Sequence, residues 1–459
     1  MNRPNLETFL RSARVHLRLH AQLDAARYLA RWAVLVAPLA VVTGSAVALF
    51  LWLLEKATDA RFDQPGLLYL LPLAGLVVSV IYRRFGAHAE RGNNLIFEEI
   101  RTPGAGVPAR MAPLVFAGTV ITHLFGGSAG REGTALQMGG GIAGGMGRWL
   151  RLNPAQLRVF LMAGVAAGFG AVFGTPFAGA IFATEVLVAG RLEYAALLPA
   201  LIAAVIADWT TAAWGIEHTN YEVATIAVTR DGLPFSLLLM AKVVLASAAF
   251  GFASVLFAES VHAVGRFTQA TIRRPEFRPV VGGVAVIALV LATGTRDYLG
   301  LGVSSPVAGA TTIVSSFHDG GASPFAWLAK TVFTAVTLGS GFKGGEVTPL
   351  FYVGASLGNT LAGVLHAPVD LFASLGFVAV FAGAANAPLA STVMGIELFG
   401  AGNSVYLAVA CFVSYLVSGH GGIYVAQRIA ATKAAKPGPP DHSSESHTPQ
   451  SQQSGRSDR

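Results

Sequence analysis

The glycine-rich stretch GSAGREGT places an arginine and a glutamate inside a strongly apolar chain. Arg131 and Glu132 lie between Gly130 and Gly133, directly before a run that is expected to form a helix. Backbone N–H groups at a helix N-terminus bind small anions, because they point in one direction and the helix dipole adds positive potential. A carboxylate there competes with the anion and releases the donors when it is protonated. Gly130 and Gly133 are therefore candidate anion ligands and Glu132 is a candidate gate; the alternative is a structural ion pair between Glu132 and Arg131 or another cation.

A second stretch, GSGFKGGEVTPL, repeats the arrangement with Lys343, Glu346 and Thr348. An ionisable side chain at membrane depth is costly and is by default a functional candidate, which applies to Glu346. The hydroxyl of Thr348 can donate to an anion or relay between a carboxylate and an ion. For Lys343 we favour a different interpretation, a residue at a helix end whose ammonium group extends to the cytoplasmic interface.

The elements that must position these residues are membrane helices. Of the 459 residues, 53% are hydrophobic and only 12% are charged, which is typical of a membrane protein. The apolar segments recur along the chain, but several are shorter than the ~20 residues of a perpendicular span or are broken by Gly or Pro. Irregular backbone at membrane depth must be surrounded by protein or line a watery cavity, so we predict an all-α polytopic bundle with broken and re-entrant helices. The only cysteine, Cys411, lies in an apolar run, which excludes an intramolecular disulfide.

The net charge of +7 is concentrated beside the apolar segments, which argues against nucleic acid as a partner. The basic residues before the first segment, after the second and after the last are Arg3, Arg11, Arg14, Arg18, Arg27, Arg31, Arg83, Arg84, Arg428, Lys433 and Lys436. The positive-inside rule then places both termini in the cytoplasm. We predict that residues 1–28 form an amphipathic segment on the cytoplasmic membrane surface, and that residues 431–459 form a disordered cytoplasmic tail.

The two halves of the chain resemble each other. In FGTPFAGAIFATE, a glutamate, Glu185, follows nine positions after Pro176, and in ANAPLASTVMGIE, Glu397 follows nine positions after Pro388. The glycine-rich stretches precede these segments in the same order. We predict a first membrane repeat over residues 29–215 and a second over 216–430, with the substrate bound between them near the midplane.

The motifs together resemble the CLC family of chloride channels and anion/proton exchangers. GREGT resembles the family motif GREGP, GSGFKGGEVTP resembles its second glycine loop, and GHGGIYVAQ resembles the segment with its central tyrosine. The match runs in order from about residue 30 to 430. The resemblance implies a CLC-type fold of two inverted repeats and a homodimer in which each subunit has its own anion pathway.

By position, Glu132 matches the external gating glutamate of that family and Tyr424 matches the tyrosine that contacts the central anion. Val186 falls where chloride exchangers place an inner proton-transfer glutamate, and Glu185 precedes it. Asn93, in GNNLI, falls at the position of the family's central serine, and its amide can still donate.

These departures are similar to the bacterial fluoride/proton antiporter branch, which has GREGT, GGEVTP and no inner glutamate. The resemblance implies that Glu346 and Thr348 serve the fluoride and proton pathway, with Val347 in the same anion-binding loop. Thr134 stands where most of the family has proline.

The function implied by this resemblance is a secondary transporter of the bacterial inner membrane that exports cytoplasmic fluoride in exchange for protons. The alternative is a passive chloride or halide channel of the same fold, which the missing inner glutamate supports. A membrane enzyme is disfavoured, because the sequence offers no catalytic triad, no His/Cys metal spacing and no phosphate-binding loop of the Walker type. We therefore expect no metal and no cofactor; the expected partners are fluoride or chloride, protons, membrane lipid and a second copy of the chain.

Overall fold

The computed structural model describes the chain except residues 1–5, 87, 105, 226–235, 430–432 and 434–459, and for residues 6–21 it describes the backbone alone. Almost all of the tail predicted over residues 431–459 therefore lies outside the described residues.

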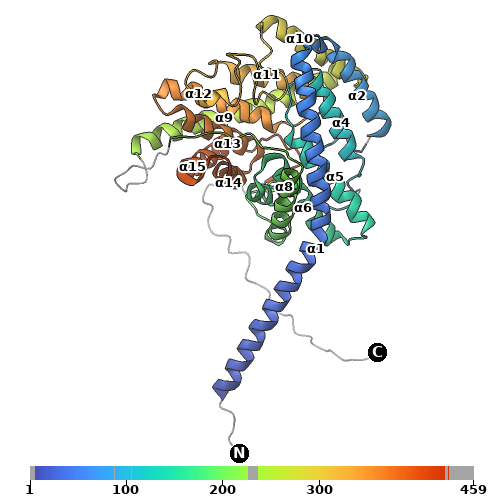
Figure 1. The fold of residues 1–459 in the computed structure, drawn as a ribbon, viewed down its shortest axis with the longest axis vertical. Helices are drawn as coiled ribbons and strands as arrows, with labels where there is room; N and C mark the ends of the chain where they lie inside the picture. Colours follow the sequence, from blue (N-terminus) through green and yellow to red (C-terminus); the bar gives the residue numbers. More distant parts are fainter. Residues whose placement is uncertain (1–5, 87, 105, 226–235, 430–432, 434–459) are drawn as a thin grey trace, which may run out of the picture.

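The described chain is a bundle of tilted helices packed around one another (Figure 1). The α-helices are α1 (Leu6–Asp63), α2 (Leu71–Phe85), α3 (Asn93–Arg101), α4 (Met111–Leu124), α5 (Glu132–Trp149), α6 (Pro154–Phe173), α7 (Pro176–Glu185), α8 (Tyr194–Ala213), α9 (Leu237–Thr271), α10 (Arg278–Thr293), α11 (Ala326–Gly339), α12 (Val347–Leu365), α13 (Val369–Ala385), α14 (Pro388–Phe399) and α15 (Ser404–Val417). Short 3-10 helices are η1 (Pro65–Leu70), η2 (Pro275–Phe277), η3 (Ser315–Phe317) and η4 (Ala401–Asn403). Two short strands, β1 (Val188–Ala189) and β2 (Arg428–Ile429), pair in parallel.

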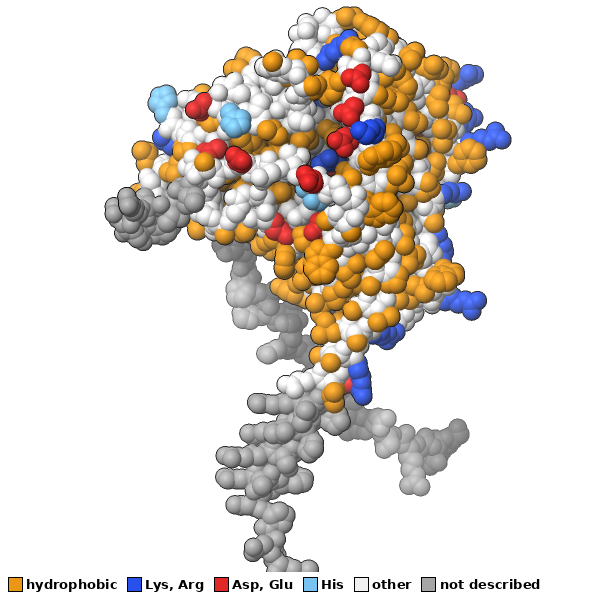
Figure 2. Space-filling model, in the orientation of Figure 1, with side chains coloured by type: hydrophobic (Ala, Val, Ile, Leu, Met, Phe, Trp, Pro, Cys, Tyr) orange, Lys and Arg blue, Asp and Glu red, His pale blue; other side chains and the backbone are white. Residues whose placement is uncertain are grey.

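Helix lengths support the prediction of spans mixed with shorter pieces. Within the described part of the chain, 6 helical segments are long and apolar enough to cross a membrane, and α4, α11, α13 and α14 are among shorter apolar helices. The space-filling view accordingly shows a broad apolar surface (Figure 2). Some of the shorter helices begin or end at buried residues, such as α13 at Ala385 and α14 at Pro388, so their termini are available to line a site.

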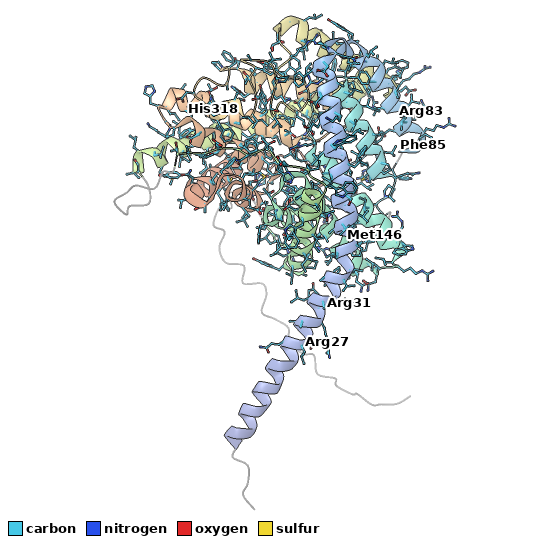
Figure 3. All side chains as sticks on the ribbon, viewed as in Figure 1. Arg27, Arg31, Arg83, Phe85, Met146 and His318 are labelled. Atoms are coloured by element: carbon cyan, nitrogen blue, oxygen red, sulfur yellow. The ribbon has the colours of Figure 1, made fainter. Side chains whose placement is uncertain are left out.

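Helix α1 extends from the basic N-terminal segment into the bundle. It is continuous from Leu6 to Asp63, so no helix end falls at residue 28. Arg27 and Arg31 lie on the stretch of α1 near the lower edge of the bundle, and Arg83 lies beside Phe85 at the end of α2 (Figure 3). The basic segment and the first apolar segment are therefore one helix, because neither Gly nor Pro separates them.

The two halves contain matching helices in the same order, α4–α8 and α11–α15. Small residues let neighbouring helices approach closely within each half. A methyl group on Gly354 of α12 would lie 2.0 Å from the carbonyl oxygen of Gly376 in α13, and a methyl group on Gly376 would lie 2.1 Å from that of Gly354. Side chains larger than hydrogen do not fit at this crossing.

The repeated proline-to-glutamate spacing has a structural purpose. Pro176 and Pro388 begin α7 and α14, and the glutamates end α7 and lie in the last turn of α14. The carboxylate of Glu185 accepts two backbone N–H groups at the start of α14, and that of Glu397 accepts two at the start of α7. The four N···O distances are 2.8–3.1 Å, from Leu389, Ala390, Phe177 and Ala178. Each half thus caps a helix of the other half, satisfying N–H groups that a helix start leaves free.

Candidate functional site

The two glycine-rich loops meet at the centre of the molecule. Gly130 and Gly345 form an antiparallel bridge, with N···O distances of 2.6 Å from Gly130 to Gly345 and 2.8 Å in the reverse direction. A methyl group on Gly130 would lie 2.8 Å from Oγ1 of Thr348 and 2.9 Å from the carbonyl oxygen of Gly345. Glycine at position 130 therefore allows the loops to pair, and the pairing brings the N-termini of α5 and α12 together.

The carboxylate of Glu132 lies on the N-terminus of α12. Its Oε2 accepts the backbone N–H of Thr348 at 2.9 Å and the Thr348 hydroxyl, and it also accepts the backbone N–H of Arg131 at 3.2 Å. The side chain is 2% exposed. Nε of Arg131 lies 3.6 Å from Oε1 of Glu132, so the ion pair considered as the structural alternative is also present. Glu132 thus occupies donors that could hold a small anion.

A cavity of about 210 Å³ lies beside the loops and is lined by Asn93, Tyr424, Glu346 and Gln137, among other residues. Oδ1 of Asn93 and the hydroxyl of Tyr424 are buried and have no hydrogen-bond partner among the described residues. We call this cavity the central chamber. Buried polar atoms are normally paired, so the Tyr424 hydroxyl has the capacity to donate to an anion or water, and Oδ1 of Asn93 has the capacity to accept from water.

Gly133 and Val347 lie next to the paired glycine-rich loops. A methyl group on Gly133 would lie 3.1 Å from Cα of Gly345 and 3.4 Å from Nδ2 of Asn93, so Gly133 packs closely against the second loop. Val347 is the first residue of α12 and is buried.

The central chamber continues into a larger cavity on one side. This cavity, of about 560 Å³, shares Tyr82, Glu90, Val261 and Lys343 with the chamber. Nζ of Lys343 lies 4.3 Å from the centroid of the Tyr82 ring. Lys343 therefore directs its ammonium group to the passage between the two cavities and packs it over an aromatic face.

On the other side of the loops, a cavity of about 20 Å³ is lined by Glu132, Thr348 and Arg131. That volume holds about one water-sized molecule. It shares Arg131 and His218 with an open vestibule of about 760 Å³, which we call the outer vestibule. The outer vestibule carries the acidic residues Glu55, Asp59, Asp63 and Glu217. Figure 2 shows acidic side chains gathered over the upper part of α1 and beside it.

Three further positions singled out in the sequence, Thr134, Val186 and Glu185, make other contacts. The hydroxyl of Thr134 is buried and lies 2.7 Å from that of Thr119. Val186 is fully buried, and its carbonyl oxygen accepts from Gln427 at 2.9 Å. Glu185 caps α14, and position 186 carries no carboxylate.

Sequence reasoning missed Gln137, which lines the chamber, and two phenylalanines that pack against Tyr424. Gln137 lies one turn beyond the GREGT loop and could have been found as a polar residue among apolar and glycine neighbours. The rings of Phe97 and Phe182 pack edge-on against Tyr424, with centroids 5.1 and 6.3 Å away. These phenylalanines carry no local sequence signal, because they come from separate helices.

No group of three or more His, Cys, Asp or Glu side chains suited to a metal ion is present in the described ranges.

Comparisons with known proteins agree with this arrangement. Residues 74–419 match the family described as "Voltage gated chloride channel". The chain is 48% identical over 424 residues to the "Chloride/fluoride channel protein" of Pseudomonas syringae pv. tomato, covering 91% of each chain. It is 26% identical over 331 residues to the "H(+)/Cl(-) exchange transporter ClcA" of Vibrio parahaemolyticus, covering 69% of this chain and 67% of that one.

Solved structures show the same fold. A CLC-type fluoride/proton antiporter superposes with a TM-score of 0.81 at 33% identity, covering 88% of this chain and 98% of that chain. A slow cyanobacterial Cl−/H+ antiporter superposes with a TM-score of 0.71 at 18% identity, covering 86% and 96%. The chain is a multi-pass membrane protein with the CLC fold of two inverted repeats, and it belongs to the voltage-gated chloride channel (CLC) family, near its fluoride antiporter branch.

Proposed function

We propose that this protein is a secondary active transporter that exports cytoplasmic fluoride in exchange for protons. The observation that carries the proposal is the position of the Glu132 carboxylate on the N-terminal donors of α12, between the central chamber and the outer vestibule. A proton on Glu132 weakens its hold on these donors, and an anion can then take its place. Anion movement and proton binding are thereby linked at one carboxylate.

In the proposed pathway, small neutral N–H and O–H groups bind the anion. In the proposal, Asn93 and Tyr424 bind it in the chamber, the amides of Gly133 and Val347 guide it through the paired loops, and Thr348 receives it as Glu132 departs. The N–H of Gly130, predicted from the sequence as an anion ligand, instead donates to Gly345, so Gly130 contributes by pairing the loops. Glu346 lines the chamber and carries protons on the inner side. Fluoride is small, strongly hydrated and a strong hydrogen-bond acceptor, so neutral N–H and O–H groups suit it. The names of the relatives, which include a chloride/fluoride channel protein and a fluoride/proton antiporter, support this choice.

The proposed orientation places both termini in the cytoplasm of a bacterial inner membrane. The supporting observation is the number of arginines in the sequence before and within the first part of α1 and at the end of α2. Figure 3 shows Arg27 and Arg31 on the lower part of α1 and Arg83 at the end of α2. The outer vestibule lies at the other end of α1, among Glu55, Asp59 and Asp63, and would face the periplasm. We further propose two membrane repeats divided near residues 215 and 216, between α8 and α9, and a homodimer embedded in lipid.

A passive chloride or halide channel is the second candidate. The observation that favours it is the fully buried Val186 at the position where exchangers carry an inner glutamate. A channel lets each ion follow its own gradient, whereas an exchanger drives one ion with the other.

Reconstituted liposomes separate these functions. We expect a proton gradient to drive fluoride against its own gradient, with little chloride movement under the same conditions. If fluoride only follows its own gradient and chloride passes equally well, the antiporter proposal is wrong and the channel is supported.

A further inference from the structure

A buried arginine at the end of α1 has no anionic partner. Arg61 is 8% exposed, and within the described ranges its guanidinium forms no ion pair and no hydrogen bond; Nε is buried and unsatisfied. The guanidinium makes a cation–π contact with the ring of Phe62, whose centroid lies 4.4 Å from Cζ of Arg61. The helix C-terminus favours a cation, but this effect is small compared with the cost of burying an unpaired charge.

Lys330 is a second buried cation, and it lies with Arg61 against the loop that contains Gly300. Lys330 is fully buried and donates to the carbonyl oxygens of Tyr298 and Gly300 at 3.1 and 2.8 Å. A methyl group on Gly300 would lie 3.2 Å from Nη2 of Arg61, so Arg61 and Lys330 both lie against this loop. Neither cation has a carboxylate within ion-pair distance in the part of the chain that the structure describes.

Arg61 lines a cavity of about 130 Å³ together with Arg296, Asp297 and the exposed Ser304. Nη1 of Arg296 donates to the carbonyl oxygen of Pro65 at 3.1 Å. Among the described residues, Asp297 is the one carboxylate lining this cavity, and its Oδ2 accepts the backbone N–H of Thr311 at 3.1 Å. Two arginines therefore face one carboxylate that is already engaged in holding the loop.

We infer that this cavity is a binding site for a halide ion, separate from the site at Glu132. The buried guanidinium of Arg61 supplies the charge, and Arg296 supplies a second cation at the rim. The site lies where α1 ends, at the edge of the bundle far from the N-terminus (Figure 1). It shares Phe62 and Ser304 with the outer vestibule, so a halide can enter from there.

Bromide makes the site directly visible. In crystals of the full chain soaked in sodium bromide, we expect an anomalous peak in the cavity within contact distance of Arg61, in addition to any peak in the central chamber. A well-ordered Arg61 with no bromide beside it, or paired with Asp297 instead, would overturn the inference.

Variants test it in solution. Sodium bromide should raise the melting temperature relative to sodium gluconate at equal ionic strength, because a ligand stabilises the state that binds it. Part of this shift should be lost in Arg61→Met and in the milder rim variant Arg296→Gln, but retained in the exposed control Arg266→Gln. If the variants that fold keep the full shift, the site does not exist.

Removing a negative charge should have the opposite effect on the bromide-dependent shift in melting temperature. Asp297→Asn removes the negative charge from the cavity and should enlarge the bromide-dependent shift. A smaller shift in Asp297→Asn would contradict the assignment. These measurements require no transport, so they are independent of the proposed fluoride/proton exchange.

Discussion

The hydroxyl of Thr348 is the side-chain donor that holds the Glu132 carboxylate on α12, and Thr348→Val removes it with little change in shape. The backbone N–H of residue 348, at 2.9 Å from Oε2, remains. A hydrogen bond to a charged group contributes about 1.5–3 kcal/mol, and about 1.4 kcal/mol corresponds to tenfold in an equilibrium. The seated position of Glu132 should therefore become less favourable by about ten- to a hundredfold relative to positions away from α12.

The expected result is a leak. With the gate held less firmly, fluoride should cross Thr348→Val without a matching proton, so the ratio of fluoride to proton flux should rise above the wild-type value. Fluoride and pH electrodes on the same suspension of proteoliposomes measure both fluxes. Thr348→Ser keeps a hydroxyl and should remain close to the wild type.

Thr134 provides a matched control, because its hydroxyl is also buried but lies 2.7 Å from that of Thr119 rather than on a carboxylate. Thr134→Val should lower stability and leave the flux ratio unchanged. The reasoning is refuted if Thr348→Val keeps wild-type coupling, or if Thr134→Val leaks to the same extent.

Further predictions concern the caps, the helix crossing and the inner carboxylate. Glu185→Gln and Glu397→Gln each lose a charged acceptor at a helix N-terminus and should lower the free energy of unfolding by about 2 kcal/mol, measured by denaturation in detergent; unchanged stability would contradict the capping role. Gly354→Ala should destabilise by about 1–3 kcal/mol through overpacking, whereas Gly363→Ala in the same helix has open space and should be neutral or gain up to about 1 kcal/mol. Glu346→Gln should abolish proton flux in liposomes, and a proton flux that survives it would remove the role proposed for the second loop.

Much of the fold could be predicted from the sequence because membrane burial imposes strong rules. The proline-to-glutamate spacing indicated the repeat, yet its purpose became clear only in three dimensions, where Glu185 and Glu397 cap helices of the opposite half. Short-range patterns do not specify such contacts between residues far apart in the chain. A change from basic to apolar composition marks a change of environment and need not end a helix, so α1 continues through residue 28.

For the candidate site, the glycine-rich loops identified Glu132 and Thr348, and the structure brings them into direct contact. The sequence could not show that Gly130 pairs with Gly345, nor that the hydroxyl of Thr134 bonds that of Thr119. Fluoride itself followed from resemblance, because neutral N–H and O–H donors alone do not distinguish one halide from another.

The most direct test of coupling at Glu132 is a simultaneous measurement of fluoride and proton flux in liposomes containing Glu132→Gln. Glutamine fills the same space but cannot exchange a proton, so the account predicts that proton movement stops and that a proton gradient no longer drives fluoride uphill. Proton-driven fluoride accumulation that persists in Glu132→Gln would contradict the account.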